Sequence, residues 1–116
     1  MNKYEQTLTK AKSENLIDER KVMVFSTAKT LPNGEHGLCL LCVNGNTLGI
    51  YDTDFNQNIG EMMYKITLNH ISNIKNSSFI FNRYLKFEYE GRKYHLADFG
   101  DAKRFNEVIL NESKKK

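Results

Sequence analysis

The stretch KFEYEGRKYHLADFGDAKRFNEVIL, residues 86–110, decides the fold class of this chain. Its first half alternates apolar and polar side chains on either side of a Glu-Gly pair, which predicts two strands joined by a tight turn. Its second half predicts an amphipathic helix, because one stripe of side chains is apolar. That stripe consists of Ala102, Phe105, Val108 and Ile109. We therefore expect the chain to end in a hairpin and a single helix.

Acidic residues mark the start of this predicted helix. Asp98 is the expected N-cap, and Asp101 falls in the first turn, where the helix dipole favours a carboxylate. Residues 98–100 match the DFG motif of protein kinases, but the chain has no glycine-rich loop and no HRD sequence. We therefore interpret the motif as a helix cap and a glycine-assisted bend.

Further strands are predicted upstream, where the pattern also has a period of two. An Asn-Gly turn is expected at residues 44–46, a polar loop at 53–62, and at 69–78 a short turn that leads into another strand. The predicted strands are residues 21–28, 37–43, 47–52, 63–68, 84–90 and 92–97 together with the one that follows the short turn.

The N-terminal residues have a different period. Residues 3–19 predict a helix, with Tyr4, Leu8 and Ala11 on its apolar stripe. About seven strands with no helix between them favour a sandwich or barrel. The predicted fold is mainly β (α+β), an antiparallel barrel or sandwich capped by the C-terminal helix. We divide the chain into an N-terminal helix (1–20), a β domain (21–112) and a basic tail (113–116).

Composition restricts the classes of function. The chain has 116 residues, 40% hydrophobic content and a net charge of +3, which fits one globular domain. Nucleic-acid binding is not expected, because it needs basic residues clustered on one face. No apolar run is long enough to cross a membrane, and the first residues lack the apolar segment of a secretory signal. We expect a cytoplasmic protein.

Cys39 and Cys42 form a CxxC pattern inside the apolar stretch GLCLLCV. A zinc site needs four ligands, and no second pair follows. On a strand, this spacing sends the two side chains to opposite faces. We therefore predict two free, packed thiols, on a strand that is covered on both faces.

No catalytic, cofactor-binding or metal-binding site is predicted. His36, His70 and His95 fall in a loop, in a turn and on the outward side of a strand, so they define no common site. The acidic loop at residues 52–61 lacks the central glycine and the flanking helices of an EF-hand. We expect a protein that is not an enzyme.

Three stretches carry a resemblance to a known family: NGNTLGIYD (44–52), YKITLNHISNIK (64–75) and the final hairpin and helix (85–109). Over about residues 22–111 the chain resembles the bacterial pleckstrin-homology-like (PH/GRAM-like) domains. This resemblance implies a PH-like barrel that acts as a non-enzymatic binding or assembly module. Eukaryotic relatives often bind phosphoinositides through a Lys-x-n-Arg pattern. The matching residues 21–37 contain no arginine, so this chain departs from that pattern.

Phe79, Ile80 and Phe81 are the candidate interaction residues. A period of two cannot bury three consecutive large apolar side chains in one core, so at least one is exposed or covered by a partner. Packing beneath the N-terminal helix is the alternative. The expected partner is a protein, and this includes a second copy of the chain that pairs through a strand edge or this segment.

Binding to an anionic membrane surface is the second hypothesis. It would use Lys29 and the lysines of the C-terminal tail, since basic residues are attracted to an anionic bilayer. These candidates are Lys29, Lys114, Lys115 and Lys116. A solubilising terminus is the alternative explanation of the last three.

Overall fold

A computed structural model describes residues 2–97 and 99–115. In these residues, seven strands form a single antiparallel sheet, with one α-helix near each end of the chain. The elements are α1 (Lys3–Ser13), β1 (Met23–Thr30), β2 (Gly37–Asn44), β3 (Thr47–Thr53), β4 (Ile59–Thr67), the 3-10 turn η1 (Leu68–His70), β5 (Ser72–Phe79), β6 (Asn82–Tyr89), β7 (Arg92–Ala97) and α2 (Ala102–Ser113).

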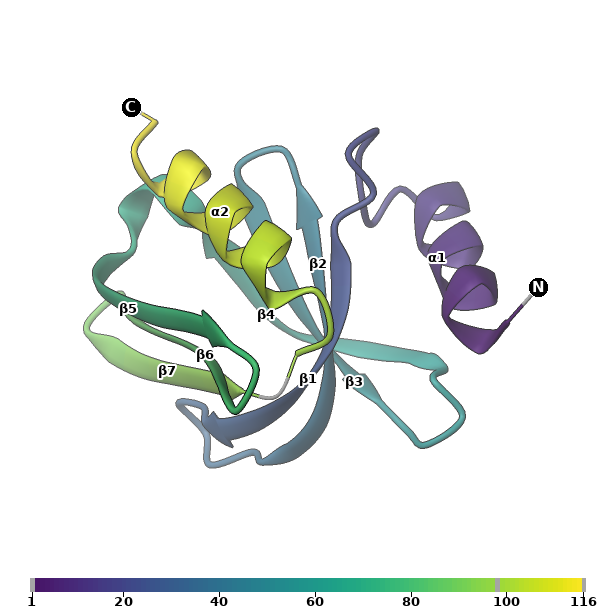
Figure 1. Ribbon diagram of the computed structural model, residues 1–116, viewed down its shortest axis with the longest axis horizontal. Coiled ribbons are helices and arrows are strands. Elements are labelled where there is room, and N and C mark those ends of the chain that lie inside the picture. The colour runs from purple at the N-terminus through teal and green to yellow at the C-terminus, as the bar shows by residue number, and fades with distance from the viewer. Residues whose placement is uncertain (1, 98, 116) are drawn as a thin grey trace.

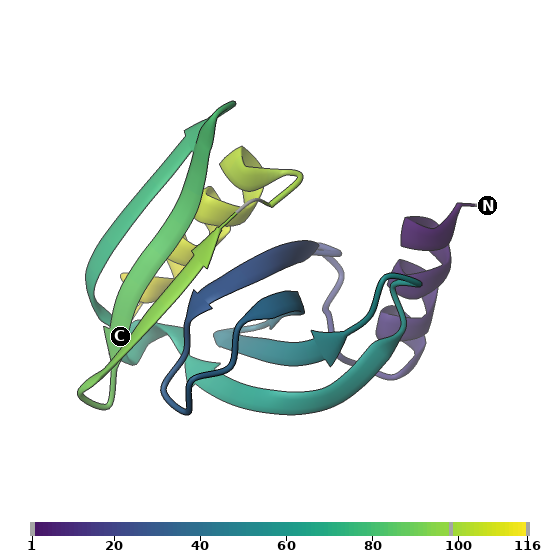
Figure 2. The same cartoon turned by 90° about the horizontal axis from the view of Figure 1, so that it is seen from below.

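The sheet is open and strongly bent. Its strand order is β4-β3-β2-β1-β7-β6-β5, so β4 and β5 are the edges. Figure 2 shows two arms, β1–β4 and β5–β7, that meet where β1 pairs with β7. Helix α2 lies on the inner side of the bend and α1 on the outer side (Figure 1). The predicted mainly β fold of about seven strands with a capping helix is confirmed, and the sheet does not close.

The core has two parts because β2 is covered on both faces. The inner part lies between the two arms and α2, and it includes Leu41, Phe87 and Phe105. The outer part lies beneath α1 and includes Ala11 and Leu40. The predicted two-sided coverage of this strand is therefore confirmed.

The two cysteines follow this division. Cys39 belongs to the inner part of the core and Cys42 to the outer part. Both are free thiols, and burial raises the pKa of each to about 12. They therefore remain protonated at neutral pH and act as small packing residues, as predicted.

Helix α1 ends at Ser13, so the predicted helix over residues 3–19 was too long. Asn15 has a φ of 61°, in the left-handed region where a helix cannot continue. The amide of Leu16 donates to the carbonyl of Ala11 at 2.8 Å, and the amide of Asn15 to that of Lys12 at 3.1 Å. This pair of bonds is a Schellman motif, and it satisfies the last carbonyls of the helix.

The two edge strands differ most from the prediction. β4 begins at Ile59, inside the predicted polar loop, and β5 occupies most of the predicted turn at 69–78. Residues 60–62 of β4 are all exposed, and β5 buries no residue fully. An edge strand that is exposed on most sides has no alternation of apolar and polar residues. The bounds of β4 and β5 therefore could not be predicted from such an alternation.

Helix α2 begins one turn later than predicted. Its N-cap is Asp101, whose side chain makes no capping hydrogen bond, and the predicted N-cap Asp98 lies outside the described residues. The apolar stripe is confirmed: Ala102, Phe105 and Ile109 are buried. Among the described residues, no helix is both long and apolar enough to cross a membrane.

A close approach of β4 to β3 explains the glycine at position 60. A Cβ atom on Gly60 would lie 2.7 Å from the backbone oxygen of Asp52. We predict that Gly60→Ala lowers the free energy of unfolding by about 1–3 kcal/mol, as overpacking does in cores. Urea denaturation measures this change. Gly100→Ala is the control, because no atom lies within 4 Å of its Cβ position. Equal stability of both variants would contradict the predicted clash.

Candidate functional site

The turn between β5 and β6 carries the predicted interaction residues, which we call the apolar tip (Phe79, Ile80 and Phe81). Their exposed fractions are 79%, 76% and 99%. Figure 2 shows this turn at the free end of the β5–β7 arm. The alternative of packing beneath the N-terminal helix is wrong, because all three side chains face solvent. Exposure of this size is unusual for consecutive large apolar residues.

Helix α2 holds the base of the apolar tip. The side-chain amide of Asn106 donates to the carbonyl of Ser77 and to the hydroxyl of Ser78, both at 3.2 Å. Arg83 of β6 donates to the carbonyl of Gly100 at 3.3 Å.

A shallow hollow of about 580 Å³ lies beside the tip, and its lining is polar apart from the aromatic rings. It is lined by Asn76, Ser77, Ser78, Phe79, Asn82, Tyr84 and Lys103.

A second surface feature, which we call the loop groove, lies between the β1–β2 loop and β4. It has a volume of about 650 Å³ and combines apolar and acidic side chains. The apolar ones include Leu38 and Met62, and the acidic ones are Glu35, Asp52 and Glu61. No lysine or arginine is among the described residues that line it. The β1–β2 loop, where the family resemblance would place a phosphate site, therefore contributes the carboxylate of Glu35 and faces those of Asp52 on β3 and Glu61 on β4.

The β1–β2 loop is fixed by polar contacts. The Tyr64 hydroxyl donates to Glu35 Oε1 at 2.7 Å and accepts from the Asn33 amide at 3.0 Å. Arg92 at the start of β7 donates to the carbonyl of Pro32 at 3.0 Å. The hydrogen bond from Tyr64 lowers the pKa of Glu35, so this carboxylate is ionised at neutral pH. One wall of the loop groove is thus a preformed loop that carries the ionised carboxylate of Glu35.

Cations face solvent on the outer side of the β5–β7 arm. Lys75 lies opposite Lys86, and Lys86 lies opposite His95, in three adjacent strands. Burial lowers the pKa of His95, and the charges of Lys86 and Lys29 lower it further. This row was not predicted, because Lys75 lay in a predicted turn and the register between strands cannot be read from one sequence.

The predicted lipid-binding residues do not form one site. Lys29 is the next-to-last residue of β1 and lies near His95, whereas Lys114 and Lys115 follow α2. The Lys115 ammonium donates to the carboxylate of Glu112 at 2.6 Å, so its charge is compensated within the chain. Lys116 lies outside the described residues.

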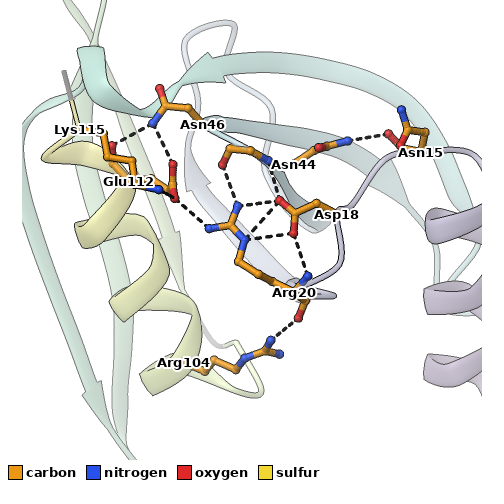
Figure 3. Close-up of polar contacts among 9 residues, drawn as sticks. Asn15, Asp18, Arg20, Asn44, Asn46, Arg104, Glu112 and Lys115 are labelled. Carbon is orange, nitrogen blue, oxygen red and sulfur yellow. Dashed lines mark hydrogen bonds and ion pairs between the residues drawn. The ribbon is translucent and has the colours of Figure 1, made fainter.

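A polar cluster joins the end of α2 to the segment before β1 (Figure 3). The Arg20 guanidinium contacts Asp18 Oδ2 at 2.7 Å and Glu112 Oε2 at 2.9 Å, and it also donates to the Gly45 carbonyl at 2.8 Å. Asn46 donates to the Glu112 carbonyl at 2.9 Å. Three segments that are distant in the sequence are thereby fixed together: residues before β1, the β2–β3 turn and α2.

The cluster keeps both acidic groups ionised. The hydrogen bond from Arg20 holds the pKa of Asp18 well below its ordinary value of 3.8. Burial raises the pKa of Glu112, but hydrogen bonds from Lys115, Asn46 and Arg20 outweigh burial and the net shift is downward. Since every partner belongs to the fold itself, we interpret the cluster as structural.

The three histidines of the sequence analysis lie apart from one another, whereas Asp52 and Glu61 of the acidic loop both line the loop groove. His36 is exposed in the β1–β2 loop, His70 is exposed at the end of η1, and His95 is half-buried on the outer side of β7. Within the described part of the chain, no group of three or more His, Cys, Asp or Glu side chains could hold a metal ion.

Comparison with known proteins identifies the fold. No family model and no curated protein sequence matches the chain. The chain is similar in structure to the pleckstrin homology domain of ArhGAP27, with a TM-score of 0.57 and 10% identity over 80% of this chain and 96% of that one. It is also similar to the C-terminal domain of an unknown protein from Leishmania infantum, with a TM-score of 0.60 and 14% identity over 97% and 95% of the two chains. At these identities the likeness shows a PH-like fold and nothing further.

The polar cluster makes a testable contribution to stability. We predict that Glu112→Gln lowers the free energy of unfolding at pH 7 by about 1–3 kcal/mol, the usual value for a lost hydrogen bond to a charged group. A carboxylate with a depressed pKa stabilises the fold above its ordinary pKa, and this stabilisation is lost as the pH falls through the folded value. The parent should therefore lose stability below about pH 4.5, the ordinary value for Glu112, and the variant should lose less.

Urea denaturation between pH 3 and 7 measures both effects. The control is Glu19→Gln, because Glu19 pairs with Lys12 at 2.9 Å but its side chain is 90% exposed. An exposed ion pair contributes little to stability. If the free energy of unfolding falls equally steeply with decreasing pH in the parent and in Glu112→Gln, Glu112 does not provide the proposed stabilisation.

Proposed function

We propose that this PH-like domain is a non-catalytic association module in the cytoplasm that binds protein through the apolar tip. One observation carries the proposal: three consecutive large apolar side chains are almost fully exposed at a hairpin end whose base is hydrogen-bonded to α2. Burying each of these side chains contributes roughly 1.5–3 kcal/mol before the cost of association. Exposed apolar clusters of this kind mark binding surfaces.

Contact through the tip is favoured over pairing of strand edges. The side chain of Asn106 on α2 donates a hydrogen bond to the Ser77 carbonyl on β5. An added strand at this edge would compete with that hydrogen bond. The β4 edge exposes the charged residues Glu61 and Lys65, a common way in which sheets avoid edge pairing. The tip has no comparable protection.

The association is expected to depend on the tip and not on exposed aromatic residues in general. We predict that the parent gains mass above 13.5 kDa as its concentration rises, and that Phe79→Ser/Phe81→Ser keeps the monomer mass. Light scattering coupled to size exclusion measures this. Phe55→Ser is the matched control, because Phe55 is 93% exposed in the β3–β4 loop and should leave the mass unchanged.

Folding must be checked in the same samples. Both substituted positions are exposed, so we expect the circular dichroism spectrum and the urea midpoint of the tip variant to match the parent. A parent that remains a monomer at every concentration would contradict self-association. Equal assembly of the tip variant and the parent would show that the tip is not the contact.

Insertion of the apolar tip into an anionic membrane surface is the second candidate function. The observation that favours it is that the same hairpin carries Lys75 and Lys86 side by side on its outer face. Apolar insertion combined with electrostatic attraction gives firmer membrane binding than either alone.

Membrane binding has a distinct signature. If it occurs, the parent should sediment with phosphatidylserine-rich vesicles at low salt, and binding should fade as salt rises. Lys75→Ala/Lys86→Ala should then weaken binding several-fold, while Lys3→Ala/Lys65→Ala, which removes two exposed lysines elsewhere, should not. Absence of the parent from the vesicle pellet at low salt would rule out this candidate.

A further inference from the structure

We propose that the partner of the apolar tip is a second copy of this chain, and that the tip of one molecule inserts into the loop groove of the next. This inference rests on the proposed association function and adds to it the identity of the partner and its receiving surface. Three properties of the two surfaces carry it: apolar character, charge and their places on the molecule.

The loop groove offers exposed apolar atoms. Leu38 at the start of β2 is 38% exposed and Met62 of β4 is 48% exposed, and both line the groove together with Met63. Methionine side chains are flexible and adapt to aromatic rings, with which their sulfur atoms make favourable contacts. The groove volume of about 650 Å³ lies within the range of 300–1,000 Å³ typical of binding pockets.

The charges around the two surfaces are opposite. Lys103 lines the hollow beside Phe79, and Arg83 lies on β6 directly behind the tip, opposite Ser78. The groove contributes the carboxylates of Glu35, Asp52 and Glu61. Complementary charges at the rim of an interface steer two molecules into one orientation and oppose wrong pairings.

The two surfaces belong to different places on the molecule. The tip is formed by β5 and β6, whereas the groove is formed by β1 to β4 and the β1–β2 loop, and no residue is shared. Figure 2 shows the β5–β6 turn and the β1–β2 loop at opposite ends of the view. Each molecule can therefore give its tip to one neighbour and receive a tip from another. A contact between two different surfaces produces a ring or an open chain.

This geometry predicts complementation between two variants that cannot self-assemble. The tip variant Phe79→Ser/Phe81→Ser keeps its groove, and the groove variant Asp52→Lys/Glu61→Lys keeps its tip. We expect each alone to stay at 13.5 kDa, and an equimolar mixture to form a particle of twice that mass and no larger. Light scattering coupled to size exclusion at 0.15 M salt measures this. The parent should form larger particles at the same concentration.

A matched control separates the groove from net charge. Glu90→Lys/Glu107→Lys makes the same charge change at two exposed positions outside the groove, and it should assemble like the parent. Circular dichroism and a urea midpoint confirm that each variant is folded.

The outcomes that overturn the inference are distinct. If the groove variant assembles like the parent while the tip variant does not, the association function stands and the groove is not the receiving surface. If the charge control also loses assembly, net charge and not the groove governs it. If the tip variant assembles like the parent, the proposed function and this inference both fail.

Discussion

Packing of α2 into the bend of an open sheet is the constraint on which the rest of the structure depends. Edges β4 and β5 leave the sheet unclosed, so the inner face needs a cover to exclude water. Phe105 and Ile109 supply this cover from α2, and Phe99 packs on Phe105 with ring centroids 5.2 Å apart. Without this helix the inner core would face solvent, at a cost of roughly 25 cal/mol for each Å² of exposed apolar surface.

Polar contacts fix the position of α2 at its C-terminal end and at its middle. Glu112 near its C-terminal end is bound by Arg20 and Asn46, while Asn106 in its middle binds β5 at Ser77. The first set of contacts fixes the helix to the β2–β3 turn, and the second fixes the β5–β6 hairpin to the helix. A consequence is that the apolar tip projects from a supported hairpin. Binding through a pre-organised segment avoids much of the entropy lost when a flexible loop is ordered.

Helices and strands could be predicted from the sequence where their burial imposes a regular spacing of apolar residues. They could not be predicted where the element is not buried. The final hairpin, α2 and the doubly covered β2 were predictable because their apolar residues repeat with a period of two or 3.6. β5 was not, since an exposed edge strand has no such repeat. The tip was found because Phe79–Phe81 breaks the pattern. The loop groove and the row of Lys75, Lys86 and His95 depend on contacts between distant strands, which local patterns do not encode.

Burial of the apolar tip on association is the central claim, and one spectroscopic measurement tests it directly. The chain contains no tryptophan, so Phe81→Trp places a single indole reporter at the tip. If the tip enters an apolar groove, the fluorescence emission should shift to shorter wavelength as the protein concentration rises. Phe55→Trp, at another exposed position, should keep the emission of a solvated indole. An emission of the Phe81→Trp protein that stays solvent-like at every concentration would contradict the account.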